Sequence, residues 1–146
     1  MSQAIDTRHL VIYADDDPDD LELVEEAFSP YKDHVELITF NNGDAALQFF
    51  QNNSDITPCL IILDINMPGI SGKDLLRKIR QMDRLAKVPA VLFTTSNSVR
   101  DMEFAMHYNA GFITKPLDIH QMELIAEKFI DHCSDDIRKI IRKQLQ

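Results

Sequence analysis

The sequence predicts an α/β protein in which a doubly wound, five-stranded parallel sheet, with strand order 2-1-3-4-5, carries helices on both faces. Three observations predict this fold. Five short apolar runs, most of them rich in β-branched or aromatic residues, are spread along the 146-residue chain. Stretches with apolar residues at helical spacing lie between these runs. The third run is apolar at every position, as expected for a central strand that is buried on both faces.

The first strand is expected at residues 9–14, "HLVIYA". Asp17 followed by Pro18 is a typical helix start, with a capping side chain and then a proline in the first turn. Asp19 and Asp20 fall in that first turn, where the helix dipole favours negative charge. The helix continues through apolar residues spaced three and four apart: Leu21, Val24 and Phe28.

The second and third units repeat this order. A strand at 35–40, "VELITF", precedes a short apolar helical stretch at 45–50. The central strand is "CLIIL" at 59–63, and Ser71 is a candidate cap for the helix that follows it. The apolar positions of that helix are Leu75, Leu76, Ile79 and Met82.

The last two strands are expected at 89–93, "PAVLF", and at 111–114, "GFIT". A short helix at 102–106 lies between them. Asp118 is a candidate cap for a final helix. Its apolar positions are Ile119, Met122, Ile125, Phe129 and Ile130.

Composition limits the functions to consider. A net charge of −9 argues against nucleic-acid and anionic-membrane binding, because both need a basic surface. No apolar run approaches the roughly 18 residues of a membrane span, and residues 1–10 lack the apolar core of a signal peptide. Cys59 and Cys133 have no metal-site or disulfide-framework spacing, and Cys59 is expected to be a buried thiol. These features predict a single domain in the reducing cytoplasm.

Polar residues follow four of the five predicted strands, at the edge where such sheets bind ligands. Asp15 and Asp16 follow the first strand, Asp64 the third, Thr94 the fourth, and Lys115 the fifth. Three carboxylates together favour a hard cation, and Mg²⁺ is preferred because it leaves room for phosphate oxygens. A cation, a lysine and a hydroxyl around a carboxylate form a constellation for phosphoryl transfer, in which the carboxylate is a competent acceptor.

These residues, with "LDINMPGISG" after the third strand and "TKP" after the fifth, resemble the receiver domain of two-component response regulators over residues 7 to 131. The resemblance implies the CheY-like, flavodoxin-like fold. It implies that Asp64 is the phosphoacceptor, and that Asp15 and Asp16 bind Mg²⁺ with Asp16 the direct ligand. Asn66 would add its backbone carbonyl to the metal site.

The resemblance also implies a switch. Thr94 would contribute its hydroxyl, Lys115 would pair with the phosphoryl group, and Phe112 stands where the family more often has tyrosine. Because Phe112 lacks a hydroxyl group, no signal can pass through a phenol at this position. Asp64 would receive its phosphoryl group from a sensor histidine kinase, with a phytochrome-type kinase among the options, or from a phosphotransfer protein. The chain would not be an enzyme, but would support its own phosphotransfer and dephosphorylation and switch a partner-binding surface.

Three alternatives remain open from sequence alone. In a calcium loop, Asp15, Asp17, Asp19 and Glu26 would be ligands, although Asp20 occupies the position that should be glycine. A haloacid-dehalogenase-type phosphatase would need a second aspartate at the position of Asn66. An interaction module that has lost phosphorylation would not be expected to keep the acceptor set intact.

We expect the receiver domain to occupy residues 1–133, followed by a basic amphipathic tail at 134–146. Ile137, Ile140, Ile141 and Leu145 keep helical spacing in this tail. It is either a simple extension of the last helix or a contact in a homodimer or with a partner, because an apolar stripe outside the core needs cover. The chain resembles the stand-alone, single-domain response regulators.

Overall fold

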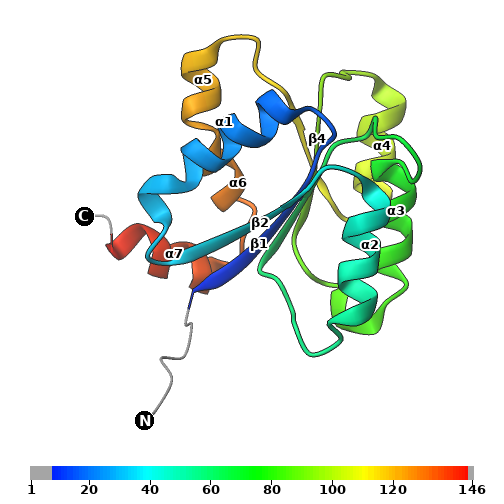
Figure 1. The fold of residues 1–146 in the computed structure, drawn as a ribbon, viewed down its shortest axis with the longest axis horizontal. Helices are drawn as coiled ribbons and strands as arrows, with labels where there is room; N and C mark the ends of the chain where they lie inside the picture. The colour runs from blue at the N-terminus through cyan, green and yellow to red at the C-terminus, as the bar shows by residue number, and fades with distance from the viewer. Residues whose placement is uncertain (1–7, 145–146) are drawn as a thin grey trace.

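The structure, a computed structural model, describes residues 8–144 and has three layers, with a sheet between two layers of helices (Figure 1). All strand pairs are parallel, in the order β2-β1-β3-β4-β5. The predicted fold class is confirmed. The strands are β1 (His9–Ala14), β2 (Val35–Phe40), β3 (Leu60–Leu63), β4 (Ala90–Thr94) and β5 (Gly111–Thr114).

Two groups of helices cover the two faces of the sheet (Figure 1). One face carries α1 (Pro18–Phe28), α5 (Ile119–Glu123), α6 (Ile125–Ile130) and α7 (Asp135–Gln144). The other carries α2 (Gly43–Asn52), α3 (Gly72–Arg80) and α4 (Val99–His107). Two short 3₁₀ turns, η1 (Ser29–Tyr31) and η2 (Asp83–Leu85), complete the description.

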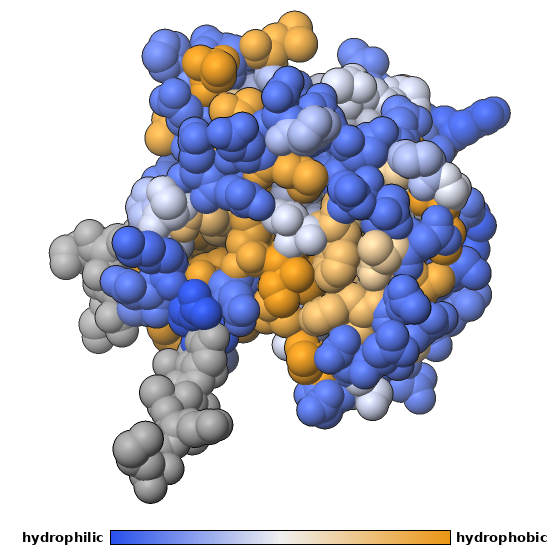
Figure 2. Space-filling view, in the orientation of Figure 1, coloured by the Kyte–Doolittle hydropathy of each residue, from blue (hydrophilic) through white to orange (hydrophobic). Residues whose placement is uncertain are grey.

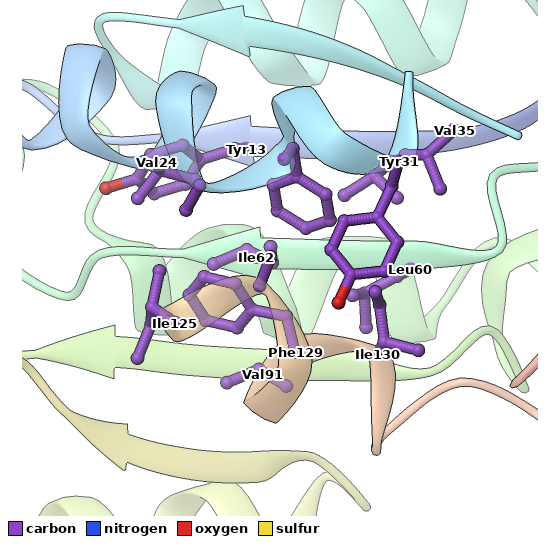
Figure 3. Packing of buried hydrophobic residues seen from close by; sticks show 14 of the residues in the cluster. Tyr13, Val24, Tyr31, Val35, Leu60, Ile62, Val91, Ile125, Phe129 and Ile130 are labelled. Atoms are coloured by element: carbon purple, nitrogen blue, oxygen red, sulfur yellow. The ribbon is translucent and has the colours of Figure 1, made fainter. Parts of the chain in front are cut away.

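Strand alternation sends neighbouring side chains into two separate cores. Leu60 and Ile62 of β3 join the core under α1 and α6, whereas Ile61 and Leu63 join the core under α2 and α3. All four are fully buried, which explains why β3 is apolar at every position. Figure 3 shows the first core, where the Phe129 ring of α6 lies over the sheet near Ile62 of β3 and Ile125 of α6. That ring stacks on Phe28 at a centroid distance of 6.1 Å.

The predicted caps fix the helix starts. Asp17, Ser71 and Asp118 each accept a backbone N–H from two or three residues further on. Pro18 occupies the first helical position of α1. Because α1 runs through Pro18–Phe28, most of the stretch that a calcium loop would need is helical, and that alternative is wrong.

The final helix of the receiver core is broken, contrary to the continuous apolar pattern. At Leu124 the backbone leaves helical geometry, with φ −101° and ψ 7°, and separates α5 from α6. Ile119, at the start of α5, is 57% exposed, whereas Met122 before the break and Ile125 after it are buried. Spacing alone did not reveal this break, since a single non-helical residue hardly changes the pattern.

The predicted tail forms α7, which folds back onto the domain. Ile141 is fully buried and Ile137 packs against the same core, whereas Ile140 remains 46% exposed. The expected stripe is therefore largely covered by the domain itself within the part described, and Leu145 lies outside the described residues. No helix among residues 8–144 is long and apolar enough to span a membrane.

The β2 edge of the sheet carries the most visible apolar surface in this orientation. Figure 2 shows apolar side chains between α7 and α2, framed by hydrophilic helices. β2 is an edge strand, and five of its six residues are only partly buried.

Candidate functional site

The polar residues predicted at the strand ends converge at the carboxyl edge of the sheet. Adjacent parallel strands hold their backbones together there: Asp64 N–H donates to Ala14 at 3.0 Å, and Lys115 N–H donates to Thr94 at 2.7 Å. The buried polar and charged residues of the described chain are Asp15, Asp64, Thr94 and Lys115. The strand-end prediction thus identified each of them.

Three carboxylates form a potential cation site. One oxygen each from Asp15, Asp16 and Asp64 can be chosen so that all lie within 4.8 Å of one another. Asp15 and Asp64 are buried and Asp16 is exposed, so the group opens to solvent on one side. Hard carboxylate oxygens, few in number and open to water, fit the coordination preferences of Mg²⁺. Asn66, two residues beyond Asp64, lies in the exposed loop that follows β3.

The Lys115 ammonium is shared among three carboxylates. Its Nζ lies 2.8 Å from Asp15 Oδ2, 2.8 Å from Asp20 Oδ2 and 3.5 Å from Asp64 Oδ2. The centroid of the Phe93 ring lies 5.6 Å from the same ammonium. The site therefore contains a fourth carboxylate, Asp20, that the sequence interpretation assigned only to the helix dipole.

A sequence signal for Asp20 exists. It is the third helical residue after the cap Asp17, a position whose side chain characteristically reaches back toward the start of the helix. In the structure, however, the Asp17 N–H donates to Asp15 and the Asp20 side chain accepts from Lys115, so this signal places Asp20 near the strand end but does not predict its partner.

Tyr13 is a second residue that sequence reasoning did not assign to the site. Its fully buried hydroxyl group donates to Asp15 Oδ2 at 2.5 Å, while the backbone N–H of Asp17 donates to Asp15 Oδ1 at 2.9 Å. Burial, followed by the charge of Asp15, raises the pKa of Tyr13 far above its usual value. Tyr13 is therefore a neutral donor, and both oxygens of Asp15 are hydrogen-bonded.

Burial and crowding make the site electrostatically strained. Burial, followed by repulsion from Asp15, raises the pKa of Asp64 to about 7, although Lys115 opposes the shift. Burial alone would lower the pKa of Lys115, but its hydrogen bonds to Asp15 and Asp20 outweigh burial and raise the pKa. Burial also raises the pKa of Asp20. Without a bound cation, Asp64 therefore holds its proton to a higher pH than a free carboxyl group does.

Thr94 connects the site to α4. It is fully buried, and its Oγ1 accepts the Ser96 N–H at 3.2 Å. The Ser96 hydroxyl donates to Asp101 Oδ2 of α4 at 2.6 Å, and the other Asp101 oxygen pairs with Lys73 of α3. In the β4–β5 register Thr94 pairs with Thr114 and Leu92 with Phe112, so Thr94 and Phe112 lie on the same face of the sheet. Phe112 is half-buried against the core under α3 and α4.

The backbone around Asp64 requires a glycine. A Cβ atom on Gly72 would lie 2.0 Å from the backbone oxygen of Asp64. The Gly72 N–H also donates to Ile65 at 3.0 Å. The start of α3 therefore packs directly beneath the loop that carries Asp64 and fixes its position.

Comparisons with known proteins place this geometry in context. A profile of the response regulator receiver domain matches residues 11–127. Response regulator Rcp1 of Synechocystis is 29% identical over 128 residues, which are 84% of this chain and 86% of Rcp1. Two-component response regulator ARR7 of Arabidopsis thaliana is also 29% identical, over 62% of this chain but only 48% of its own length.

Solved structures give the same picture. The Mn²⁺-bound form of Rcp1 superimposes with a TM-score of 0.74 at 28% identity, over 83% of this chain and 93% of that one. The phosphorylated cyanobacterial phytochrome response regulator RcpA gives a TM-score of 0.77 at 23% identity, over 87% of this chain and 97% of that one. At that identity, the second likeness shows the fold alone.

Proposed function

Because this chain belongs to the response regulator receiver family, we propose that Asp64 accepts a phosphoryl group from a partner histidine kinase or phosphotransfer protein. One observation carries the proposal: the Asp64 carboxylate lies among the carboxylates of Asp15 and Asp16 and 3.5 Å from the Lys115 ammonium. A nucleophilic oxygen, a cation site and a fixed positive group are the parts that phosphoryl transfer to a carboxylate needs.

In the transfer step, an Asp64 oxygen attacks the phosphorus of a phosphohistidine. The new P–O bond forms as the P–N bond breaks, and the histidine leaves as neutral imidazole when its other ring nitrogen carries a proton. The product is an acyl phosphate with about −1.5 to −2 charge. Asp64 must be deprotonated to attack, and Lys115 favours that form and then pairs with a phosphoryl oxygen.

We assign the cation site to Asp15, Asp16 and Asp64, with the Asn66 backbone carbonyl as a further ligand. When bound, Mg²⁺ supplies charge that offsets the repulsion between these carboxylates and the phosphoryl oxygens. Support comes from the oxygen cluster and from the Mn²⁺-bound form of Rcp1. Tyr13 and the Asp17 N–H keep the Asp15 carboxylate oriented toward this cluster.

Thr94 and Phe112 form the proposed switch. Thr94 gives up the Ser96 N–H and donates its hydroxyl to a phosphoryl oxygen, and Phe112 turns into the space on the same face of the sheet. The shared face and the Thr94–Ser96–Asp101 chain to α4 support this coupling. A partner-binding surface would then change around α4, β5 and α5.

We also propose the extent of the domain, its location in the cell and its partners. The domain would end near residue 133, with 134–146 as an appended helix, and the protein would act in the cytoplasm without binding nucleic acid or membrane. It would support its own phosphotransfer and dephosphorylation without being an enzyme. The relation to RcpA makes a phytochrome-type kinase a partner worth testing. A homodimer is also proposed.

The test is incubation with Mg²⁺ and acetyl phosphate, followed by intact mass measurement. Wild type should gain one phosphoryl group, and Asp64→Ala should gain none. Asp44→Ala, which removes an acid from the first turn of α2, is the control and should label fully. Full labelling of Asp64→Ala would contradict the assignment.

A further inference from the structure

We infer that Asp20 competes with the phosphoryl group for Lys115, and that this competition weakens the phosphorylated state. The inference rests on the proposed function, because it assumes that Lys115 pairs with a phosphoryl group on Asp64. Asp20 is a positioning residue here: it acts through the lysine and does not contact the transferred group.

The geometry favours Asp20 over the acceptor. Lys115 hydrogen-bonds to Asp15 and Asp20, each at 2.8 Å, while Asp64 lies at 3.5 Å, beyond the usual range for such a bond. The ammonium has three N–H groups and no other polar capacity. In the unphosphorylated protein, two of the three are therefore directed away from the residue that receives the phosphoryl group.

The two competing carboxylates differ in what they lose when the lysine turns to a phosphoryl oxygen. Asp15 retains the Tyr13 hydroxyl at 2.5 Å and the Asp17 N–H at 2.9 Å. Asp20 gives up the hydrogen bond that it accepts from Lys115. Since Asp15 stays satisfied, the energetic cost of moving the lysine falls mainly on the Asp20 pair.

The negative charge of Asp20 also opposes phosphorylation directly. Its carboxylate shares the lysine with Asp64, so it adds negative charge beside a group that gains negative charge on phosphorylation. Its side chain is 18% exposed, so water can replace the lysine only partly. Removing the charge should therefore favour the phosphorylated form.

Asp19 provides a matched control. It is in the same first turn of α1, is exposed, and carries the same charge relative to the helix dipole. Asp19→Asn changes the net charge of the chain and the helix start as Asp20→Asn does, but leaves the Lys115 hydrogen bonds in place.

The experiment measures the affinity for beryllium trifluoride, a phosphoryl analogue, by calorimetry at saturating Mg²⁺. Asp20→Asn should lower its dissociation constant about fivefold, the upper end for one partly exposed ion pair. It should also slow the loss of phosphoryl groups added with acetyl phosphate. Asp19→Asn should match wild type, and Asp20→Ser serves as a second variant if Asp20→Asn does not fold.

A double-mutant cycle separates action through the lysine from a simple charge effect. In a Lys115→Ala background, the effect of Asp20→Asn should shrink to the smaller part that comes from its charge alone. An unchanged or weaker affinity in both Asp20 variants, an equal gain in Asp19→Asn, or a full effect without Lys115 would overturn the inference alone. If wild type neither binds beryllium trifluoride nor labels on Asp64, the proposed function and this inference fail together.

Discussion

The carboxyl and amino ends of the same sheet differ in how their buried groups are satisfied. At the carboxyl end, Asp15, Asp64 and Lys115 are buried charges that depend on one another. At the amino end, the fully buried Ile141 joins a core that is mostly apolar, and a groove of about 540 Å³ beside β3 and β4 is lined partly by Cys59 and Ile137.

The amino end of the sheet should therefore determine mainly the stability of the protein, and the carboxyl end mainly its binding chemistry. Apolar packing at the amino end has one best arrangement and tolerates little loss of volume. The carboxyl end holds repulsion among carboxylates, which a bound cation would offset and a phosphoryl group would increase. Substitutions at the amino end should therefore mainly reduce stability and leave the site unchanged, whereas substitutions of the buried charges at the carboxyl end should mainly change what the site binds.

The largest effect is expected from Ile141→Ala in α7. Removing this fully buried side chain should lower the free energy of unfolding by about 2–4 kcal/mol, through lost burial and a residual cavity. Mg²⁺ affinity should stay unchanged, because α7 covers the amino end. Urea denaturation and calorimetry measure the two quantities. Ile140→Ala, on the exposed side of α7, should cost far less, and equal losses from both variants would contradict the packing of α7 described above.

A pH dependence should appear at the carboxyl end. Since the pKa of Asp64 is raised to about 7, Mg²⁺ binding below that pH must displace a proton. Affinity should fall by up to about tenfold for each pH unit below 7, and level off above it. Calorimetry from pH 5.5 to 8.5 tests this, with buffers of different ionisation enthalpy to count released protons. An affinity that stays flat across this range would sink the prediction.

Asp64→Asn should stabilise the metal-free protein at alkaline pH. A raised folded-state pKa means that the contribution of Asp64 to stability is present below its unfolded value near 3.8 and is lost as pH rises through about 7. At pH 8 the variant should therefore be more stable than wild type by on the order of 1 kcal/mol. At pH 4 this advantage should vanish.

Thermal unfolding of both proteins across this pH range measures the difference. Asp74→Asn, at an exposed acid of α3 paired with Arg77, is the control and should show no such pH-dependent gain. If the advantage of Asp64→Asn persists unchanged at pH 4, its cause is not the ionisation of Asp64.

The same comparison explains what sequence could predict. The strands and the rim residues Asp15, Asp16, Asp64 and Lys115 were predictable, because parallel strands bring their carboxyl ends together whatever the details of packing. The pairing of Asp20 with Lys115 joins residues 95 positions apart, and only the orientation of α1 on the sheet decides it. The direction of the Tyr13 hydroxyl depends likewise on neighbouring rings. The docking of Ile141 needs the reversal of the chain after α6, which no local pattern encodes.

The smallest effect is expected at the edge of the site, where the chain from Thr94 to α4 ends in an ion pair. Asp101→Asn should weaken the contacts to Lys73 and to the Ser96 hydroxyl and lower the free energy of unfolding by about 0.5–1 kcal/mol. Because the substitution changes only the side chain of Asp101 and not its backbone, the loss should be local. The amides of Ser96 and Ser98, which donate to Thr94 Oγ1 and Ser96 Oγ, should exchange hydrogen faster, whereas amides in β3 should not. Faster exchange throughout the sheet would mean that this ion pair supports the whole fold and not the loop beside the site.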